Sequence, residues 1–159
     1  MPITTQKLPS FNAIAPGSTA SLKVPATVTY AAIDIQVTHD VTGTPTLMSL
    51  ADMKTKIERV RLMIDGHAAW NITGKNLVEW NDYYNQNAAD NSGILSLVFA
   101  QGYLDNPMNE DALALGTASK ANGKAIQNVT VEVELASDVV APKLEATATA
   151  YTGAYLPTG

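Results

Sequence analysis

The sequence predicts an all-β fold, an antiparallel β-sandwich or jelly roll of about eight strands with one or two short helices in the connections. Three observations support this prediction. Apolar and polar residues alternate over several short segments, turn-forming residues separate these segments at regular intervals, and one segment alone has convincing helical spacing. Short alternating strands separated by regular turns are typical of antiparallel sandwiches and not of sheets built from β-α-β units.

Two strands are predicted near the start of the chain. Thr19–Val24 alternates small polar with apolar residues and ends before Pro25. Thr29–Thr38 is longer, and its apolar residues fall on one face while Asp34, Gln36 and Thr38 fall on the other. A loop at residues 41–45 follows, because Gly and Pro lie there.

Local signals then predict a helical turn and a hairpin. Ser49 is placed to cap a single turn at Leu50–Met53, with Asp52 completing a capping box. The pair Asp65-Gly66 predicts a type I′ turn, because both central residues of that turn need a positive φ. It would join a strand at Val60–Ile64 to a strand at His67–Ile72.

The convincing helix covers Lys75–Asn85 after Thr73. Its inward face is predicted to carry Leu77, Val78 and either Trp80 or Tyr84, which share helical spacing. A polar loop follows at residues 85–93.

The second half contains three further strands. Ile94–Ala100 is densely apolar, which predicts burial on one or both faces. Ile126–Leu135 and Lys143–Tyr151 alternate cleanly. Between Ile94–Ala100 and Ile126–Leu135, Gln101–Gly123 is a long excursion with a helical turn expected at Glu110–Leu115, ended by Gly116.

Length and composition predict a single domain over residues 1–159, with residues 1–10 as an N-terminal arm and residues 152–159 as a tail. The chain has no Cys, which excludes disulfides and thiol chemistry, and its net charge of −5 disfavours direct nucleic-acid binding. No stretch is long and apolar enough to span a membrane, and the first residues lack a signal-peptide core. We therefore expect synthesis in a cytoplasm.

No catalytic, cofactor-binding or metal site is predicted. His39 and His67 are the only histidines, neither lies at ligand spacing from another, and both are read as exposed turn residues. No Ser lies in a nucleophile elbow. We therefore predict that the protein is not an enzyme and has no small-molecule substrate.

Clusters of charged residues are the remaining candidates for an ion-binding or phosphate-binding site. The run from Asp105 to Asp111, and the group Asn87, Asp90 and Asn91, carry oxygen ligands but lack EF-hand spacing, so solvated loops are the preferred interpretation. Four basic residues lie within eight positions: Lys54, Lys56, Arg59 and Arg61. They fit either a phosphate or lipid-headgroup patch or pairing with carboxylates on an adjacent strand or subunit, and Glu58 among them favours pairing.

Two glycosylation sequons and a group of aromatic residues also occur in the chain. Asn71-Ile72-Thr73 and Asn128-Val129-Thr130 match the glycosylation sequon, and we interpret both as chance matches. The aromatic residues around the hairpin and helix fit core packing by default, or a ligand platform: Trp70, Trp80, Tyr83 and Tyr84.

A resemblance to a known family extends over roughly residues 8–150. The segments that carry it are Leu8–Ile14, Pro16–Ser18, Leu22–Pro25, Tyr30–Asp34, Ile57–Gly66, Leu77, Gly93–Phe99, Ala112–Thr117, Val129–Leu135 and Ala141–Ala146. Because these segments occur in this order and at this spacing, the chain resembles the N-terminal domain of a coat protein. That coat protein belongs to tailless phages with an internal membrane, of the corticovirus type.

The resemblance implies an upright jelly roll that forms capsomers of an icosahedral shell over a lipid bilayer. It implies partners that are other copies of the chain, a second coat or vertex protein, and the internal membrane; the location would be the virion, after synthesis in the host cytoplasm. Structural calcium at capsid interfaces is also implied, although no residue here matches a ligand set.

Two questions stay open at this point. Family members carry two jelly rolls per chain, whereas this sequence ends after the first, so either a second barrel is missing or the protein has a single barrel. The alternative function is a carbohydrate- or receptor-binding sandwich. That alternative requires the aromatic rings to be exposed together in one concave patch.

Overall fold

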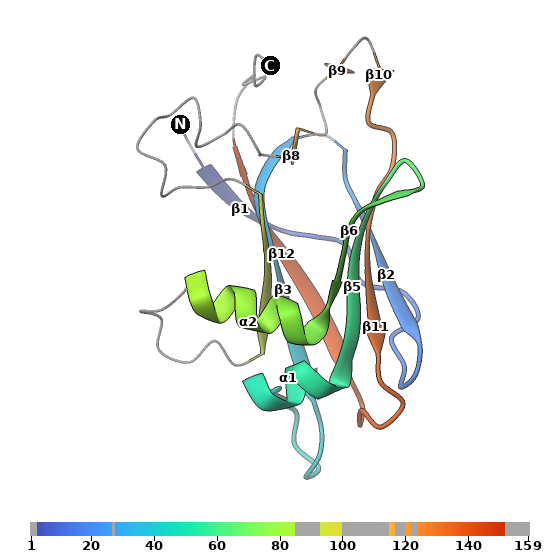
Figure 1. Cartoon of the computed structure of the whole chain (residues 1–159), viewed down its shortest axis with the longest axis vertical. Helices are drawn as coiled ribbons and strands as arrows, with labels where there is room; N and C mark the ends of the chain where they lie inside the picture. The colour runs from blue at the N-terminus through green and yellow to red at the C-terminus, as the bar shows by residue number, and fades with distance from the viewer. Residues whose placement is uncertain are drawn as a thin grey trace.

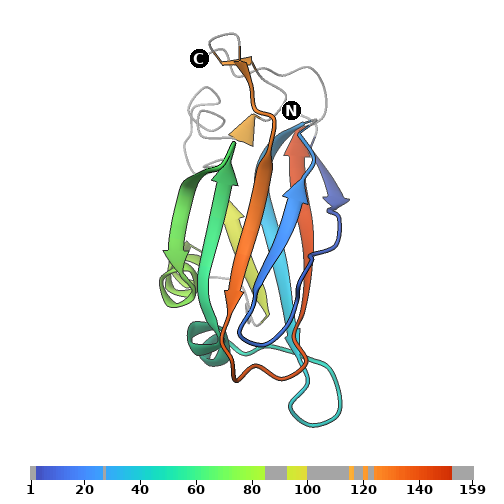
Figure 2. The ribbon, with the colours of Figure 1, turned by 90° about the vertical axis from the view of Figure 1, so that its right-hand side faces the viewer.

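Two antiparallel sheets pack face to face in the computed structural model (Figures 1 and 2), which describes residues 3–26, 28–84, 93–99, 115–116, 120–121 and 124–151. Sheet one has the order β1-β12-β3-β7. Its strands are β1 (Ile3–Lys7), β12 (Lys143–Tyr151), β3 (Thr29–His39) and β7 (Ile94–Val98). Sheet two has the order β2-β11-β5-β6. Its strands are β2 (Thr19–Val24), β11 (Val129–Leu135), β5 (Ile57–Ile64) and β6 (His67–Thr73).

This strand order is that of a jelly roll. Apart from the β5–β6 hairpin, each step from one of these strands to the next passes from one sheet to the other. The predicted fold class is therefore confirmed. Part of the segment expected as an N-terminal arm forms β1, which pairs with β12 from Ile3 opposite Tyr151 to Lys7 opposite Thr147.

Strand β3 is a central strand of sheet one and pairs with other strands along both of its edges. One edge pairs with β12, and the other pairs in tandem with three short strands: β8 (Leu115–Gly116), β7 and β4 (Thr46–Leu47). Leu115 lies opposite Tyr30 in a strand, so the helical turn expected to end there is wrong at this residue, and the rest of that turn lies outside the described residues. A further pair, β9 (Lys120–Ala121) and β10 (Lys124–Ala125), forms a separate ribbon.

The core follows the predicted alternation. Every second residue of β11 is buried, from Val129 to Leu135, and so is every second residue of β12 from Leu144 to Ala150. In β3, Ile33, Ile35 and Val37 face the same core. The alanines of β12 have small side chains. The larger aliphatic side chains of β3 and β11 therefore fill the space between the two sheets. Burial of each such side chain contributes about 1.5–3 kcal/mol.

The hairpin turn adopts the predicted geometry. Asp65 has a φ of 48° and Gly66 a φ of 83°. The Asp65 carboxylate also accepts hydrogen bonds from the backbone N–H groups of Gln127 (3.0 Å) and Asn128 (2.8 Å). The turn therefore holds the start of β11 in addition to joining β5 to β6.

Helix α1 (Leu50–Lys56) begins where the capping signal predicted. The Ser49 hydroxyl oxygen accepts a hydrogen bond from the Asp52 N–H at 3.2 Å. The helix continues past the single predicted turn to Lys56, next to the start of β5, and its residue Met53 is buried.

Helix α2 (Gly74–Tyr84) has the predicted position. Leu77 and Val78 are buried as expected, and Asn81 is buried with them. Of the two alternatives for a further inward residue, Trp80 is wrong, because it is 53% exposed, whereas Tyr84 stays a prediction, because its side chain lies outside the described residues. At about 100° per residue, a shift of one position moves a side chain from the core to the surface.

Different segments close the two open flanks of the sandwich (Figure 2). Helices α1 and α2 cover the flank beside β5, β6 and β7. The segment between β1 and β2 covers the opposite flank, where Leu8 and Phe11 are buried and Asn12 forms a backbone bridge with Ser21 of β2.

Candidate assembly surfaces

A ladder of paired charges covers the outer face of sheet two. The register places Ser21, Glu132, Arg61 and Asn71 in one row across the four strands. The Arg61 Nε lies 3.0 Å from Glu132 Oε2, and its Nη2 lies 3.7 Å from Glu134 Oε2. These side chains are about one-third exposed, so the pairs are partly shielded from water.

The remaining basic residues of the cluster also find partners within the chain. Arg59 donates to the Asn71 carboxamide oxygen at 2.8 Å, and Lys54 lies 3.9 Å from Glu79 of α2. Lys56 hydrogen-bonds Asp138 in the β11–β12 turn and thereby lowers the pKa of that carboxyl. The interpretation as pairing with carboxylates is supported for Arg61 on an adjacent strand and for Lys54 and Lys56 with carboxylates elsewhere in the chain, whereas Arg59 donates to a neutral amide.

Sheet one presents a more weakly charged outer face. Ser96 donates to the Asp34 carboxylate at 2.6 Å, and Lys7 lies 3.8 Å from Glu145 across β1 and β12. In β7, Leu95 and Leu97 are buried while Ile94 and Val98 are exposed. The apolar strand predicted at this position is therefore buried on one face.

The free edge of β7 is covered by a side chain of α2. Asn81 Nδ2 donates to the carbonyl of Ser96 at 2.9 Å, and Asn81 Oδ1 accepts from the Ser96 N–H at 2.8 Å. Sequence reasoning missed this contact. The available signal was a polar residue at the position where the spacing of Leu77 and Val78 calls for an apolar one.

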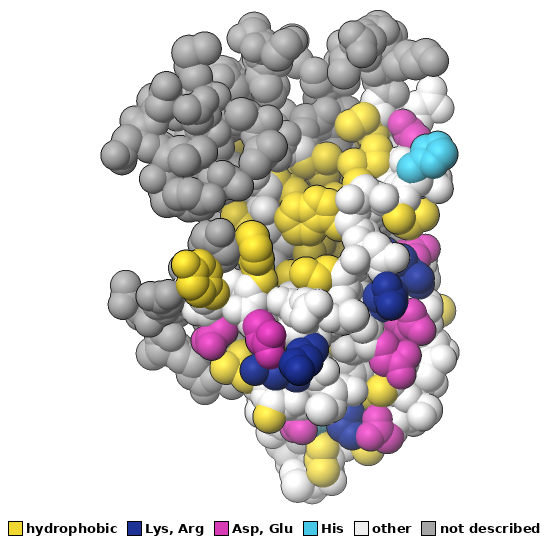
Figure 3. Space-filling view, in the orientation of Figure 1, with side chains coloured by type: hydrophobic (Ala, Val, Ile, Leu, Met, Phe, Trp, Pro, Cys, Tyr) yellow, Lys and Arg dark blue, Asp and Glu magenta, His cyan; other side chains and the backbone are white. Residues whose placement is uncertain are grey.

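An aromatic ridge, Trp80 and Tyr83, lies on the outer side of α2. The two side chains are one helical turn apart and are 53% and 67% exposed. Figure 3 shows hydrophobic side chains on this face of the molecule, with acidic and basic side chains below them. Exposed Trp and Tyr are typical of protein contact surfaces.

Trp70 belongs to a different environment. It is half-buried in β6, and its ring meets that of Phe99 edge to face with the centroids 5.3 Å apart. The described aromatic rings therefore do not form one exposed platform, which contradicts the requirement of the carbohydrate- or receptor-binding alternative. The Tyr84 side chain lies outside the described residues.

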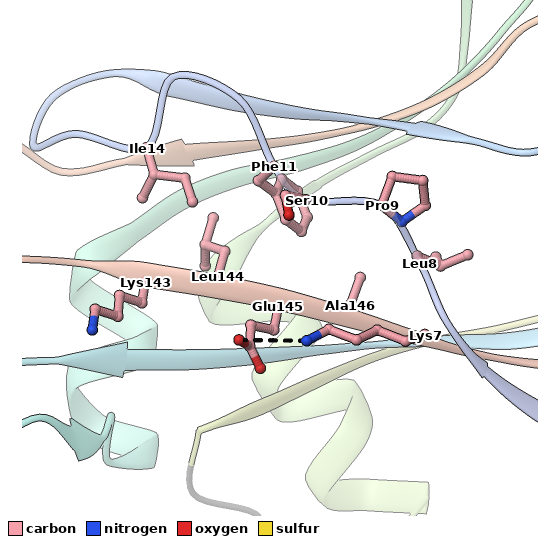
Figure 4. Close-up of a pocket in the computed structure, with 10 residues that line it drawn as sticks. All are labelled: Lys7, Leu8, Pro9, Ser10, Phe11, Ile14, Lys143, Leu144, Glu145 and Ala146. Atoms are coloured by element: carbon pink, nitrogen blue, oxygen red, sulfur yellow. Dashed lines mark ion pairs between the residues drawn. The ribbon is translucent and has the colours of Figure 1, made fainter.

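A groove of about 200 Å³ opens on the opposite flank, between the segment after β1 and the start of β12. Figure 4 shows Phe11 and Ile14 on one side, Leu144 and Ala146 on the other, and the Lys7–Glu145 pair along the rim. We call this the N-terminal groove. Its lining residues are Lys7, Leu8, Pro9, Ser10, Phe11, Ile14, Lys143, Leu144, Glu145 and Ala146.

The end of the sandwich next to α1 carries exposed aliphatic residues on two loops. The Asp40 N–H donates to the Val140 carbonyl at 3.0 Å, which joins the β3–β4 loop to the β11–β12 loop. Val41 and Val140 are both more than half exposed there.

The two histidines differ in environment. His39 is buried at the end of β3 opposite Thr46, so its interpretation as an exposed turn residue is wrong, because β3 continues one residue further than predicted. His67 is exposed directly after the turn, as expected. Within the described ranges, no three His, Asp or Glu side chains gather closely enough to hold a metal ion.

The glycosylation sequons and the acidic segments were the other candidate sites in the sequence. Asn71 and Asn128 of the sequons are exposed, in β6 and before β11 respectively. The acidic run at residues 105–111 and the group Asn87, Asp90 and Asn91 lie outside the described residues. No helix in the described part of the chain has the length and apolar character that crossing a membrane requires.

Solved structures of viral capsid proteins have the same fold. The chain is similar to the major capsid protein P2 from bacteriophage PM2, with 20% identity and a TM-score of 0.73 over 95% of this chain and 51% of that chain. It is also similar to VP54 of PBCV-1, fitted into a reconstruction of the virophage Sputnik, with 15% identity and a TM-score of 0.62 over 94% and 41% of the two chains. The STIV MCP gives 14% identity and a TM-score of 0.60 over 95% and 49%.

This chain thus spans about half of the length of these solved chains, or less. No curated protein matches its sequence.

The fold is therefore the jelly roll found in viral capsid proteins. A family model described as the N-terminal domain of viral coat protein P2 matches residues 5–152. The chain belongs to this family, as the resemblance found in the sequence indicated.

Proposed function

We propose that this chain is a structural subunit of a viral capsid, assembling with copies of itself into capsomers of an icosahedral shell. The observation that carries the proposal is the match of a coat-protein family model to nearly all of the described strands. The chain acts as a rigid building block of the virion, made in the host cytoplasm, and performs no catalysis. The internal membrane and a second coat or vertex protein are its further partners.

The geometry supports such a role through its paired charges. Arg61, Lys54, Lys56 and Lys7 each have a carboxylate partner within the chain. Copies packed side by side therefore bring together surfaces on which much of the charge is already compensated, so the desolvation of unpaired charges is limited. Many modest contacts, repeated by symmetry, then hold a shell together.

Sedimentation velocity and electron microscopy of the purified chain over a range of concentrations test the proposal. We expect a concentration-dependent transition from monomers to rings or larger regular assemblies. A chain that stays monomeric at every concentration and under shell-forming conditions would contradict the proposed role.

A further inference from the structure

We propose that neighbouring copies meet head to tail, with the aromatic ridge of one copy seated on the N-terminal groove of the next. This inference rests on the proposed capsid function, and it assigns the surfaces through which a ring of subunits closes.

The ridge is a preorganised contact surface. Leu77 and Val78 anchor α2 in the core, and Asn81 fixes it to the edge of β7 by two hydrogen bonds. Trp80 and Tyr83 therefore project from a backbone that loses little freedom on association. Trp and Tyr are also the residue types that most often dominate the energy of protein interfaces.

The groove offers a complementary recess. Ile14, Phe11 and Leu144 supply apolar walls, and the open volume of about 200 Å³ is of the size of a large side chain rather than of a drug-sized ligand. An aromatic side chain that enters it replaces water beside aliphatic carbon, which is favourable. A second copy of this chain provides such side chains at a fixed position.

The charges beside the two surfaces match. On α2, Glu79 is paired with Lys54, whereas Asp82 is exposed directly beside Tyr83, two helical turns from Lys75. At the groove, Lys7 is paired with Glu145, which leaves Lys143 as the remaining cation. A contact that brings Asp82 of one copy to Lys143 of the next therefore pairs unlike charges, which favours contact between unlike flanks over contact between like flanks.

The placement of the two surfaces makes the contact self-propagating. Figure 2 shows α2 and the segment after β1 on opposite sides of the sandwich. A contact between different surfaces on opposite sides is heterologous, so each copy uses both surfaces once and a ring closes when the rotation permits. A contact between two identical flanks would stop at a dimer.

Cross-linking tests this arrangement directly, because the chain has no Cys of its own. The double variant Ser10→Cys/Asn76→Cys places one thiol in the groove and one on the exposed side of α2, and it leaves both ridge aromatics in place. With a short thiol-specific cross-linker, the assembled protein should give a ladder of dimers, trimers and higher species. Each single variant should stop at a dimer or remain a monomer.

A matched control pair is Val41→Cys/Asn128→Cys, on exposed positions after β3 and beside the β5–β6 turn, at opposite ends of the sandwich, which a flank-to-flank contact keeps apart. It should give no ladder. Assembly without a ladder from Ser10→Cys/Asn76→Cys overturns the head-to-tail contact and leaves the capsid role intact, whereas failure of the unmodified chain to assemble overturns the capsid role itself.

Charge reversal supplies a second measurement. Asp82→Lys and Lys143→Asp should each raise the concentration needed for half-assembly, and the two together should restore most of the loss. Trp80→Ala should raise that concentration about tenfold or more, while Lys23→Ala should leave it unchanged. Additive losses from the two reversals, or an unaffected Trp80→Ala variant, would contradict the contact.

Discussion

The Asn81 carboxamide occupies the place of a neighbouring strand beside Ser96. It donates to the carbonyl and accepts from the N–H of the same residue, as the backbone of a paired strand would. An exposed strand edge is a template for pairing with other chains. The contact therefore blocks edge-to-edge association at the centre of β7 and fixes the position of α2 at the same time.

Removing this carboxamide should destabilise the fold. In Asn81→Ala, the partly buried Ser96 N–H and carbonyl lose their partners, so we expect a loss of about 1–3 kcal/mol in the free energy of unfolding, measured by urea denaturation. Asp82→Ala, at the exposed neighbouring position, should change it by less than about 0.5 kcal/mol. Equal stability of Asn81→Ala and the wild type would contradict this role.

The first residue of α2 must remain glycine. Alanine is favoured over glycine in helices by about 1 kcal/mol, but a Cβ at position 74 would meet the carbonyl oxygen of Ile57 and would lie 2.9 Å from the Ile57 Cβ. We therefore expect Gly74→Ala to lower the thermal midpoint, against the helix propensity. Lys75→Ala, one residue further on, should leave it within a few degrees of wild type, and a stabilised Gly74→Ala variant would refute the close approach.

The charge ladder predicts a measurable coupling between Arg61 and Glu132. A double-mutant cycle with Arg61→Met and Glu132→Gln should give about 0.5–1 kcal/mol of coupling, decreasing as salt is added. The exposed pair Lys7–Glu145, whose side chains are 73% and 64% exposed, serves as the comparison and should give a coupling near zero. The opposite ranking would show that shielding by the sheet does not strengthen the pair.

The burial of Tyr30 should lower the free energy of unfolding at alkaline pH. Its side chain is fully buried and its hydroxyl donates to the Pro25 carbonyl at 2.6 Å. Burial raises the pKa of this phenol above its ordinary value of about 10. The folded state therefore keeps the proton when the unfolded state loses it, so this contribution is complete below pH 10 and disappears as the pH rises through the folded-state pKa.

Unfolding of wild type and Tyr30→Phe across this pH range measures the effect. At neutral pH the variant should be less stable by about 1 kcal/mol, because the hydrogen bond to Pro25 is lost. Above pH 10 the difference should narrow. A constant difference up to pH 11 would show that Tyr30 does not contribute to the alkaline loss.

Much of the fold could be predicted because its main signals are local. Alternation in Thr29–His39, Val129–Leu135 and Lys143–Tyr151 identifies the buried face of each strand, since a strand has a side-chain period of two. Asp65-Gly66 identifies the hairpin because few residue pairs accept two positive φ values. These signals need no knowledge of what the strand packs against.

The surfaces were harder to predict because they depend on distant partners. The exposure of Trp80 follows from Asn81 taking the inward position, which is favourable only because Ser96 lies at a strand edge beside it. His39 is buried because β4 pairs with the end of β3. The N-terminal groove joins residues 7–14 to residues 143–146, and no pattern within either segment indicates that they meet.

The pairing of Ile3 with Tyr151 has a consequence for protein engineering. The first and last described strands lie side by side in opposite directions, so Ile3 and Tyr151 leave the same pole of the sandwich. A linker of a few residues would join them, and new termini could be opened at Gly43 in the exposed loop at the other pole. A circularly permuted subunit of this kind would retain the eight-stranded core while carrying any fused cargo at the opposite end of the molecule.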